Sequence, residues 1–415
     1  MRHEFPYFKC HGTHYECGFA IGKEFEYRIK EYLKEFKEFE EYLLPAINSN
    51  DGKILLDTFL TTTNKKYPWY VEEMKGIADG SSLPFDHILA LNFRVELLHV
   101  TKNKTEALII EEEELEKLME CSDFSLNTNE KKLILHNEDC ASSVYTTGYF
   151  VACEIIPQRE DYPHEDFTCF CYPGHLPGNA FAFNSSGFTF SVDALVPRYI
   201  ALKRFPRQIV SRAMLSAKNL RNLEDILLNT PIAFGFCLNL GYFGENMSLL
   251  ETEWNSEYFT PHENINSKNN IKPIMWNYEL APNLESNKTS KVSKHCIVSS
   301  SEDNLSDFYS LDYCYHFNHY ERVIIDQCVV HSSRHRRKRA DEMKRPENLQ
   351  DLLNIAFDDK DEKYPIYRIK ESYSVQCAAT VLFDLKEKRM SIYDGRIAKE
   401  HPIFDLPMNL KFINH

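Results

Sequence analysis

The chain has 415 residues, of which 43% are hydrophobic and 27% are charged, so it can bury a sizeable core and is not broadly disordered. Its formal net charge of −14 argues against a nucleic acid or an anionic membrane surface as partner and fits a small or cationic substrate better. The sequence has no apolar run long enough to span a bilayer and no secretory signal at residues 1–6, so we expect a cytoplasmic protein that does not enter a membrane.

Twelve cysteines are scattered along the chain without the paired spacing of a metal site. Cys169 and Cys171 form the one close pair, and a single intervening residue suits neither a zinc knuckle nor a redox pair. We therefore interpret most cysteines as small buried side chains in a reducing compartment and expect no metal site.

The N-terminal segment is predicted to be mainly helical after a short strand at residues 5–11. Residues 13–44 carry apolar side chains at spacings of three and four, which is typical of an amphipathic helix. Gly18 and Gly22 lie on one face of that helix. Because glycine costs about 1 kcal/mol in a helix interior, this pair predicts close packing against a neighbouring backbone, with a loose helix start as the alternative.

Two further helices are expected in the next part of the chain. The first runs from Pro68 to Gly80, with proline at its first position and glycine at its end, which is the usual polarity. The second starts at Pro84 and carries apolar side chains as far as Leu98. Residues 102–117 are highly charged, and we interpret them as a solvated linker or an exposed helix.

From Cys121 onward the pattern changes to short runs typical of strands. Strands are expected at residues 121–126, 132–137, 149–156, 167–172, 180–184, 187–192, 234–240, 248–253, 377–384 and 389–393. The segment Asn184–Gly187 is typical of a hairpin turn. Helices are expected at residues 206–217, 221–229 and 336–357, and a long surface excursion at 255–310. The order of helices, strands, helices and strands predicts an α+β or layered α/β fold.

Cys121, at the start of the first of these strands, is the candidate nucleophile. A thiol at a strand start is not a specific signal, since a free cysteine is usually structural. Its chemistry changes if the Glu120–Cys121 bond is cut by attack of the thiol on the preceding carbonyl. The new α-amino group, with a pKa of about 7.7–8, would then lie beside the thiol and act as its base, so no separate histidine would be needed.

Several segments carry a resemblance to one known family, and they follow one another in the order found there. They are GTHYECGFAIG at residues 12–22, PWYVEEMKGIADG at 68–80, ILALNFRVE at 88–96, FNSSG at 183–187 and YHFNH at 315–319. Together with Cys121 and Asp139, they extend over nearly the whole chain. The sequence resembles the acyl-coenzyme A:isopenicillin N (6-aminopenicillanic acid) acyltransferase family of N-terminal-nucleophile hydrolases, which includes insect β-alanyl-amine hydrolases.

The resemblance implies roles for four residues. Cys121 matches the nucleophile, and Asp139 matches an aspartate that would hold the α-amino group or polarise the scissile bond. Asn318 matches the asparagine that would donate an amide N–H to the tetrahedral oxyanion, an interaction worth about 2.7–4 kcal/mol. Arg368, in a less secure match at 364–368, offers a planar fork for a substrate carboxylate. The last three also each have a purely structural interpretation: a turn aspartate at a strand end for Asp139, a turn or cap asparagine for Asn318 and a surface ion pair for Arg368.

Three positions depart from the family pattern. Glu120 stands where the family has glycine, and because glutamate does not reach φ > 0 freely, a strained scissile peptide is harder to form. Asp123 replaces a hydroxyl residue linked to processing, and Glu138 replaces a tryptophan. These changes would slow maturation, shift substrate preference toward cations, or mark an inactive relative. Asp123 is a candidate residue for binding a cationic substrate.

Two other features have both a chemical and a structural interpretation. His136 and His319 would suit a papain-like Cys-His mechanism without cleavage, although each is more often a structural histidine. The basic run at 334–339 could bind an acidic group, but a solvated helix face is the favoured interpretation.

The fold that the resemblance implies is α+β, an N-terminal-nucleophile αββα sandwich of two antiparallel sheets between helical layers. Residues 1–120 would form a mostly helical pro-region or small subunit, and residues 121–415 the large subunit, together in one domain. The cleaved small subunit would be the partner of the large one.

The implied function is an amidohydrolase that cleaves N-acyl amines of the β-alanyl type through a Cys121 thioester, with no metal or bound cofactor. An N-acyltransferase that uses acyl-coenzyme A is one alternative, and an uncleaved, inactive binding homologue is another. A position of Cys121 in an apolar core, remote from Asp139 and Asn318, would exclude the proposed chemistry.

Overall fold

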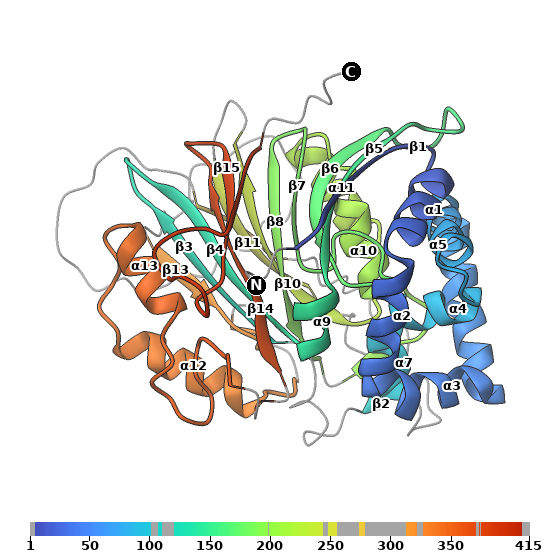
Figure 1. The fold of residues 1–415 in the computed structure, drawn as a ribbon, viewed down its shortest axis with the longest axis horizontal. Helices are drawn as coiled ribbons and strands as arrows, with labels where there is room; N and C mark the ends of the chain where they lie inside the picture. Colours follow the sequence, from blue (N-terminus) through green and yellow to red (C-terminus); the bar gives the residue numbers. More distant parts are fainter. Residues whose placement is uncertain are drawn as a thin grey trace, which may run out of the picture.

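The computed structural model describes residues 5–100, 107–109, 120–197, 199–243, 248–254, 274–278, 313–321, 327–370, 373 and 375–408. Figure 1 shows helices and strands arranged in layers around two sheets. Most of the linker predicted at 102–117 and of the excursion predicted at 255–310 lies outside the described residues. None of the described helices is both long and apolar enough to cross a membrane.

Residues 5–100 fold into one strand followed by helices. These elements are β1 (Tyr7–Gly12), α1 (His14–Glu24), α2 (Glu26–Glu35), the π-helical turn η1 (Phe39–Leu43), α3 (Leu44–Asn48), α4 (Asn50–Lys66), α5 (Pro68–Ser81), α6 (Phe85–Asn92) and α7 (Arg94–Val100). The single helix predicted at 13–44 is broken at Phe25 and Phe36, where the backbone leaves helical geometry. Helix α4 has no counterpart among the predicted elements; Ser49 caps it by accepting a hydrogen bond from the Gly52 N–H.

The two glycines of α1 lie where this helix crosses α5. A Cβ on Gly18 would overlap the carbonyl oxygen of Glu73, and one on Gly22 would overlap another carbonyl of α5. Helix α5 contributes Gly76 and Gly80, which approach the backbone of α1 in the same way. The close packing predicted from the glycine pair is therefore confirmed, because a side chain at either position would push the helices apart.

The remaining chain supplies most of the strands and a second set of helices. The strands are β2 (Ala107–Ile109), β3 (Glu120–Asn127), β4 (Lys132–Cys140), β5 (Tyr149–Ile155), β6 (Glu165–Cys171), β7 (Phe181–Asn184), β8 (Phe188–Leu195), β9 (Tyr199–Ala201), β10 (Gly235–Tyr242), β11 (Ser248–Trp254), β12 (Ile274–Tyr278), β13 (Tyr313–His316), β14 (Gln376–Asp384), β15 (Arg389–Tyr393) and β16 (Phe404–Pro407). The helices are α9 (Ser142–Thr147), α10 (Arg207–Met214), α11 (Leu220–Leu228), α12 (His331–Glu342) and α13 (Leu349–Ala356).

The strands form two large sheets. One has the order β1-β5-β6-β7-β8-β10-β11-β12 and the other the order β13-β3-β4-β14-β15-β16, while β2 and β9 form a separate pair. Every pair in the six-stranded sheet is antiparallel, as predicted. In the eight-stranded sheet, however, β1 runs parallel to β5, so the prediction of two purely antiparallel sheets is wrong at this edge. The helices between the two strands provide the long crossover that a parallel pair requires.

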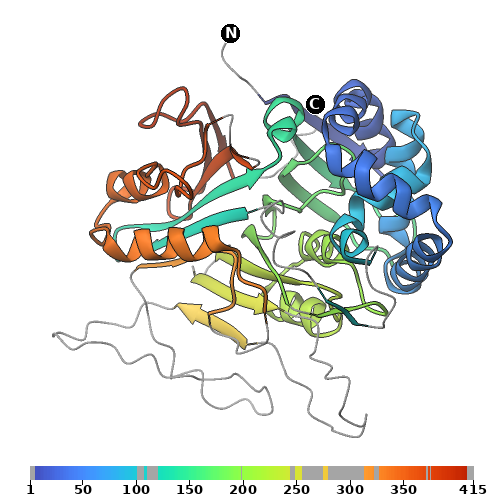
Figure 2. The same cartoon turned by 90° about the horizontal axis from the view of Figure 1, so that it is seen from below.

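Helices cover the outer side of each sheet. Figures 1 and 2 show α12 and α13 beside the six-stranded sheet and the helices of residues 14–100 beyond the eight-stranded sheet. Between the sheets, Ile134 of β4 and Val381 of β14 share one apolar core with Phe181 of β7. The architecture is therefore mixed α+β with two multi-stranded sheets and outer helices, and β1 belongs to the same sheet as strands that follow Cys121.

Several C-terminal elements refine the sequence prediction. The hairpin predicted at Asn184–Gly187 joins β7 and β8 and is confirmed. The single helix predicted at 336–357 is two helices, α12 and α13, and Pro346 lies in the segment between them. Strand β12 lies within the predicted excursion, and β16 follows the last predicted strand.

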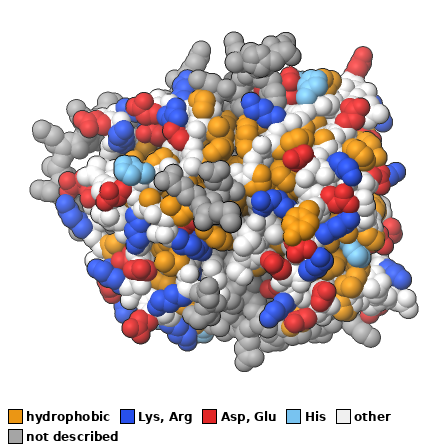
Figure 3. Space-filling model, viewed as in Figure 1, with side chains coloured by type: hydrophobic (Ala, Val, Ile, Leu, Met, Phe, Trp, Pro, Cys, Tyr) orange, Lys and Arg blue, Asp and Glu red, His pale blue; other side chains and the backbone are white. Residues whose placement is uncertain are grey.

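The charged side chains on the face drawn in Figure 3 are of both signs and are interspersed over the described helices and strands. A mixed surface of this kind differs from the continuous basic patch that a polyanion partner would favour.

Candidate active site

The pairing of β3 with β4 decides which side chains meet. Cys121 lies opposite Glu138, Asp123 opposite His136, and Glu120 opposite Asp139. Because successive side chains of a strand point to opposite faces, Cys121 and Asp123 belong to one face and Glu120 to the other. The first face is turned toward the eight-stranded sheet, and the second toward α12.

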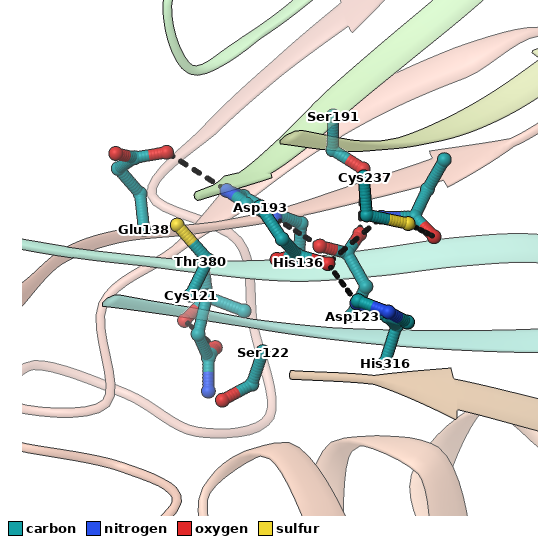
Figure 4. Close-up of polar contacts among 12 residues, drawn as sticks. Cys121, Ser122, Asp123, His136, Glu138, Ser191, Asp193, Cys237, His316 and Thr380 are labelled. Atoms are coloured by element: carbon teal, nitrogen blue, oxygen red, sulfur yellow. Dashed lines mark hydrogen bonds and ion pairs between the residues drawn. The ribbon is translucent and has the colours of Figure 1, made fainter. Parts of the chain in front are cut away.

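On the inner face, an imidazole lies between two carboxylates beside the candidate nucleophile (Figure 4). The Nδ1 of His136 is 2.6 Å from Oδ2 of Asp123, and its Nε2 is 2.8 Å from Oε2 of Glu138. The Sγ of Cys121, a ring nitrogen of His136 and a carboxylate oxygen of Glu138 all lie within 4.8 Å of one another. Asp123 also accepts a hydrogen bond from Ser191 Oγ of β8 at 2.5 Å, which connects the two sheets.

Burial and neighbouring charge set the ionisation of this group. Burial disfavours the imidazolium, but the charge of Asp123 and the hydrogen bonds to Asp123, Cys121 and Glu138 together outweigh it. The pKa of His136 therefore lies well above its ordinary value. Burial likewise opposes ionisation of Asp123, yet His136 holds the pKa of that carboxyl below its usual range. For the Cys121 thiol, burial and then the charge of Glu138 raise the pKa. The uncut chain therefore holds a buried ion pair beside a protonated thiol.

On the outer face, the carboxylate of Glu120 is bound by two arginines. Arg336 of α12 donates to Oε2 at 2.7 Å, while Arg368 donates to Oε1 at 3.0 Å and to Oε2 at 2.9 Å. The hydroxyl of Ser332 also bonds to this carboxylate. Burial raises the pKa of Glu120, but the two guanidinium groups outweigh burial and keep the pKa below its ordinary value. Glu120 is thus a buried anion held from two segments distant in sequence.

Arg336 corrects the interpretation of the basic run at 334–339 as a solvated face. Arg334 and Lys338 are exposed, but Arg336 is fully buried. Residues 332 and 340 lie one helical turn before and after Arg336, and both carry small, buried side chains. Arg336 therefore lies on the buried side of α12. The run is therefore solvated on one side and part of the candidate site on the other.

The backbone of Cys121 is held at both of its polar atoms. Its N–H donates to Oδ1 of Asn318 at 3.0 Å, and its carbonyl oxygen accepts a hydrogen bond from Arg336. Arg336 also donates to Oδ1 of Asn318 at 2.7 Å, and the Asn318 amide nitrogen donates to the Ala194 carbonyl at 3.0 Å. Asn318 therefore lies beside the nucleophile as an acceptor, and its role as oxyanion donor stays a prediction.

Asp139 lies on the same face as Glu120. Its carboxyl group is fully buried, and neither oxygen accepts a hydrogen bond from any described residue. Burial raises the pKa of Asp139 to about 7, against the influence of Arg368 and Arg336. The structure thus places an unsatisfied carboxyl opposite the Glu120–Cys121 bond.

The structure brings five of the predicted site residues, together with Glu120, to neighbouring positions on β3, β4 and the segments that pack on them: Cys121, Asp123, Asp139, Asn318 and Arg368. Arg368 contacts Glu120, and Asp123 contacts His136. His319 instead bonds to Ser333 at 2.7 Å and lies 3.2 Å from a carboxylate oxygen of Glu321. Cys121 is buried in polar surroundings, so the arrangement that would exclude the proposed chemistry is not found.

Three polar residues on neighbouring elements were not among the predicted site residues. Ser191 and Asp193 alternate with apolar side chains along β8, a signal that places both on one face of the strand. Tyr172, which follows β6, donates a hydrogen bond to Glu138 and carries no comparable signal.

A buried thiol next to an imidazole and carboxylates, at the start of a central strand, is an arrangement suited to acyl chemistry. Residues 126–272 match the model of the family described as acyl-coenzyme A:6-aminopenicillanic acid acyl-transferase; the match includes Asp139 but not Cys121. The chain is also 25% identical, over 419 residues, to the β-alanyl-dopamine/carcinine hydrolase of Drosophila melanogaster, covering 99% of this chain and 98% of that protein. These matches confirm the family resemblance and indicate an enzyme of the hydrolase or acyltransferase kind.

Proposed function

We propose that the chain is an N-terminal-nucleophile cysteine amidohydrolase that matures by cutting its own Glu120–Cys121 bond and then cleaves N-acyl amines. The observation that carries this proposal is the hydrogen bond from the Cys121 N–H to Asn318 at 3.0 Å. This nitrogen is the atom that cleavage would release as an amine. It is held in place before the cut, and the buried carboxyl of Asp139 lies across the strand pair without a partner among the described residues.

Maturation would proceed by an acyl shift within the chain. The Cys121 thiol attacks the Glu120 carbonyl carbon, the S–C bond forms, the C–N bond breaks, and the thiol proton passes to the departing nitrogen. Water then hydrolyses the thioester, which leaves a carboxylate on Glu120 and restores the thiol. The new α-amino group would donate hydrogen bonds to Asn318 and Asp139 and would serve as base for the thiol.

Catalysis would use the same atoms on an external amide. The thiol gives its proton to the α-amino group and attacks the substrate carbonyl, and the resulting ammonium returns the proton to the leaving amine. Water hydrolyses the Cys121 thioester and releases the acid. Asn318 would stabilise the oxyanion through its amide N–H, which requires that this group turn away from the Ala194 carbonyl.

The inner face supports a cationic acyl group. The carboxylate of Glu138 lies near the sulfur, and those of Asp123 and Asp193 lie on the other side of His136. A β-alanyl group carries an ammonium two carbons from the carbonyl carbon, within reach of a carboxylate beside the nucleophile. The name of the Drosophila relative, a β-alanyl-dopamine/carcinine hydrolase, agrees with this substrate class.

Two alternatives rest on specific observations. The family match favours transfer of the acyl group to an amine, with an acyl-coenzyme A as substrate. The two arginines that bind Glu120 favour an uncleaved binding homologue, because they hold the residue before Cys121 firmly within β3.

Gel electrophoresis and mass spectrometry of the purified chain test the proposal. Maturation gives fragments of 120 and 295 residues (415 − 120), the larger beginning with Cys121. Cys121→Ala should remain a single chain, whereas Cys140→Ala, which removes a buried thiol from the neighbouring strand, should still be cut. A wild-type chain that stays intact would refute self-cleavage. If that intact chain hydrolyses amides and loses activity in His136→Gln, a papain-like mechanism replaces the proposed one.

A further inference from the structure

A second group of potential ligands lies behind the candidate nucleophile, between the two sheets. Asp193 of β8, Cys237 of β10 and His316 of β13 each offer a ligand atom, and these atoms lie within 4.8 Å of one another (Figure 4). All three side chains are fully buried. Asp193 and Cys237 are direct partners in the eight-stranded sheet, whereas His316 comes from the edge of the six-stranded sheet.

The carboxyl group of Asp193 lies at the centre of this group and contacts an imidazole, an amide and a second carboxyl group. Its Oδ2 lies 3.0 Å from Nδ1 of His316 and accepts a hydrogen bond from Nδ2 of Asn239 at 3.2 Å. This carboxyl group is also hydrogen-bonded to that of Asp123, which requires a proton on one of the two acids. A cation bound here would take the place of that proton between two buried acids.

The donor set identifies the class of ligand. One thiol, one imidazole and one carboxylate are a typical set for Zn²⁺, whereas Mg²⁺ and Ca²⁺ prefer oxygen ligands throughout. The local charge agrees, since the carboxylate of Asp123 also lies within 4.8 Å of that of Asp193. A divalent cation would stabilise both acids in their ionised form.

We propose that Asp193, Cys237 and His316 form a structural site for a zinc-class divalent cation that joins the two sheets. On binding, Cys237 releases its thiol proton to solvent, and the imidazole binds in its neutral form. Because His316 precedes Asn318 by two residues, the bound cation would also fix the strand end from which Asn318 reaches Cys121.

The proposal is tested on the full-length chain after removal of metal with a chelator. Titration with Zn²⁺ alone should give one bound ion per chain by calorimetry and elemental analysis, together with a higher thermal midpoint. Co²⁺ in place of Zn²⁺ should give a thiolate-to-cobalt absorption band. Cys237→Ser should abolish the band and weaken binding at least tenfold. Asp193→Asn should have the same effects, and it replaces the cysteine variant if that variant does not fold.

Cys121→Ser and Cys328→Ser are the matched controls, and both should keep the cobalt band and the stoichiometry. Absence of stoichiometric binding to the wild-type chain would overturn the proposal. Loss of the band in Cys121→Ser, with the band retained in Cys237→Ser, would also overturn it, because the ion would then occupy the group formed by Cys121, His136 and Glu138. None of these readouts depends on self-cleavage or on amide hydrolysis.

Discussion

The backbone N–H of Cys121 donates a hydrogen bond of 3.0 Å to Oδ1 of Asn318, a residue 197 positions later in the chain. Arg336 donates to the same oxygen and to the Cys121 carbonyl, so these contacts hold the two peptide groups on either side of the Cys121 Cα. The amide oxygen of Asn318 accepts these hydrogen bonds, whereas its amide N–H is the proposed oxyanion donor, so the two groups can be tested separately.

Asn318→Asp keeps an oxygen acceptor for the Cys121 N–H and for Arg336 but removes the amide donor. We expect self-cleavage to persist while turnover of an N-acyl amine falls about 10²- to 10³-fold, the usual effect of losing one oxyanion donor. Asn318→Ala removes both groups and should also slow maturation. Fragment formation on gels and steady-state kinetics measure the two effects, and unchanged turnover in the aspartate variant would contradict the donor role.

The raised pKa of Asp139, about 7, predicts a pH-dependent contribution to stability. Between about pH 4 and about pH 7 the folded chain keeps a proton that the unfolded chain has released, so the free energy of unfolding falls as the pH rises. Asp139→Asn removes this dependence. The variant should be more stable than the wild type at pH 8 by a few kcal/mol, and it should lose turnover because the α-amino group has no anionic partner.

Urea unfolding of both proteins at pH 5 and pH 8 measures the effect of Asp139. Glu96, whose pKa burial also raises to about 7, provides the control, since Glu96→Gln should change the pH dependence of stability without abolishing turnover. An equal stability difference between wild type and Asp139→Asn at both pH values would show that this carboxyl does not titrate in that range.

Arg336→Met tests the buried ion pair with Glu120. Removing one partner leaves the other charge less well compensated in a buried position, and we expect a loss of about 3–5 kcal/mol in the free energy of unfolding. Lys338→Met, on the exposed side of the same helix, should change stability by less than about 0.5 kcal/mol. The double variant Glu120→Gln/Arg336→Met should recover part of the loss, and strictly additive effects would argue against the coupling.

Glu138→Gln tests the proposed specificity for cationic acyl groups. The substitution preserves the shape of the side chain but removes its charge, so kcat/KM for a β-alanyl amide should fall about 10- to 100-fold, as expected for a charge-assisted hydrogen bond. The propionyl amide of the same amine, which lacks the ammonium, should be affected much less. Equal losses on both substrates would place the role of Glu138 in holding His136 rather than in recognition.

Much of the local structure of this protein could be predicted from its amino-acid sequence. Short runs typical of strands predicted β3, β4 and most later strands, and the spacing of Gly18 and Gly22 predicted close packing against a neighbouring backbone, which is that of α5. These features are readable because the periodicity of a strand or helix and the small size of glycine act within a few residues. The candidate nucleophile was also identified from sequence, through its position and the family resemblance.

The surroundings of that nucleophile depend on tertiary contacts. The register of β3 against β4 sends Cys121 to one face and Asp139 to the other, and the packing of α12 turns Arg336 out of a basic run toward Glu120. The meeting of Asp193, Cys237 and His316 requires two sheets to stack. Such contacts join residues far apart in the chain, and no local pattern encodes them, because they arise only when strand register and the packing of layers are fixed together.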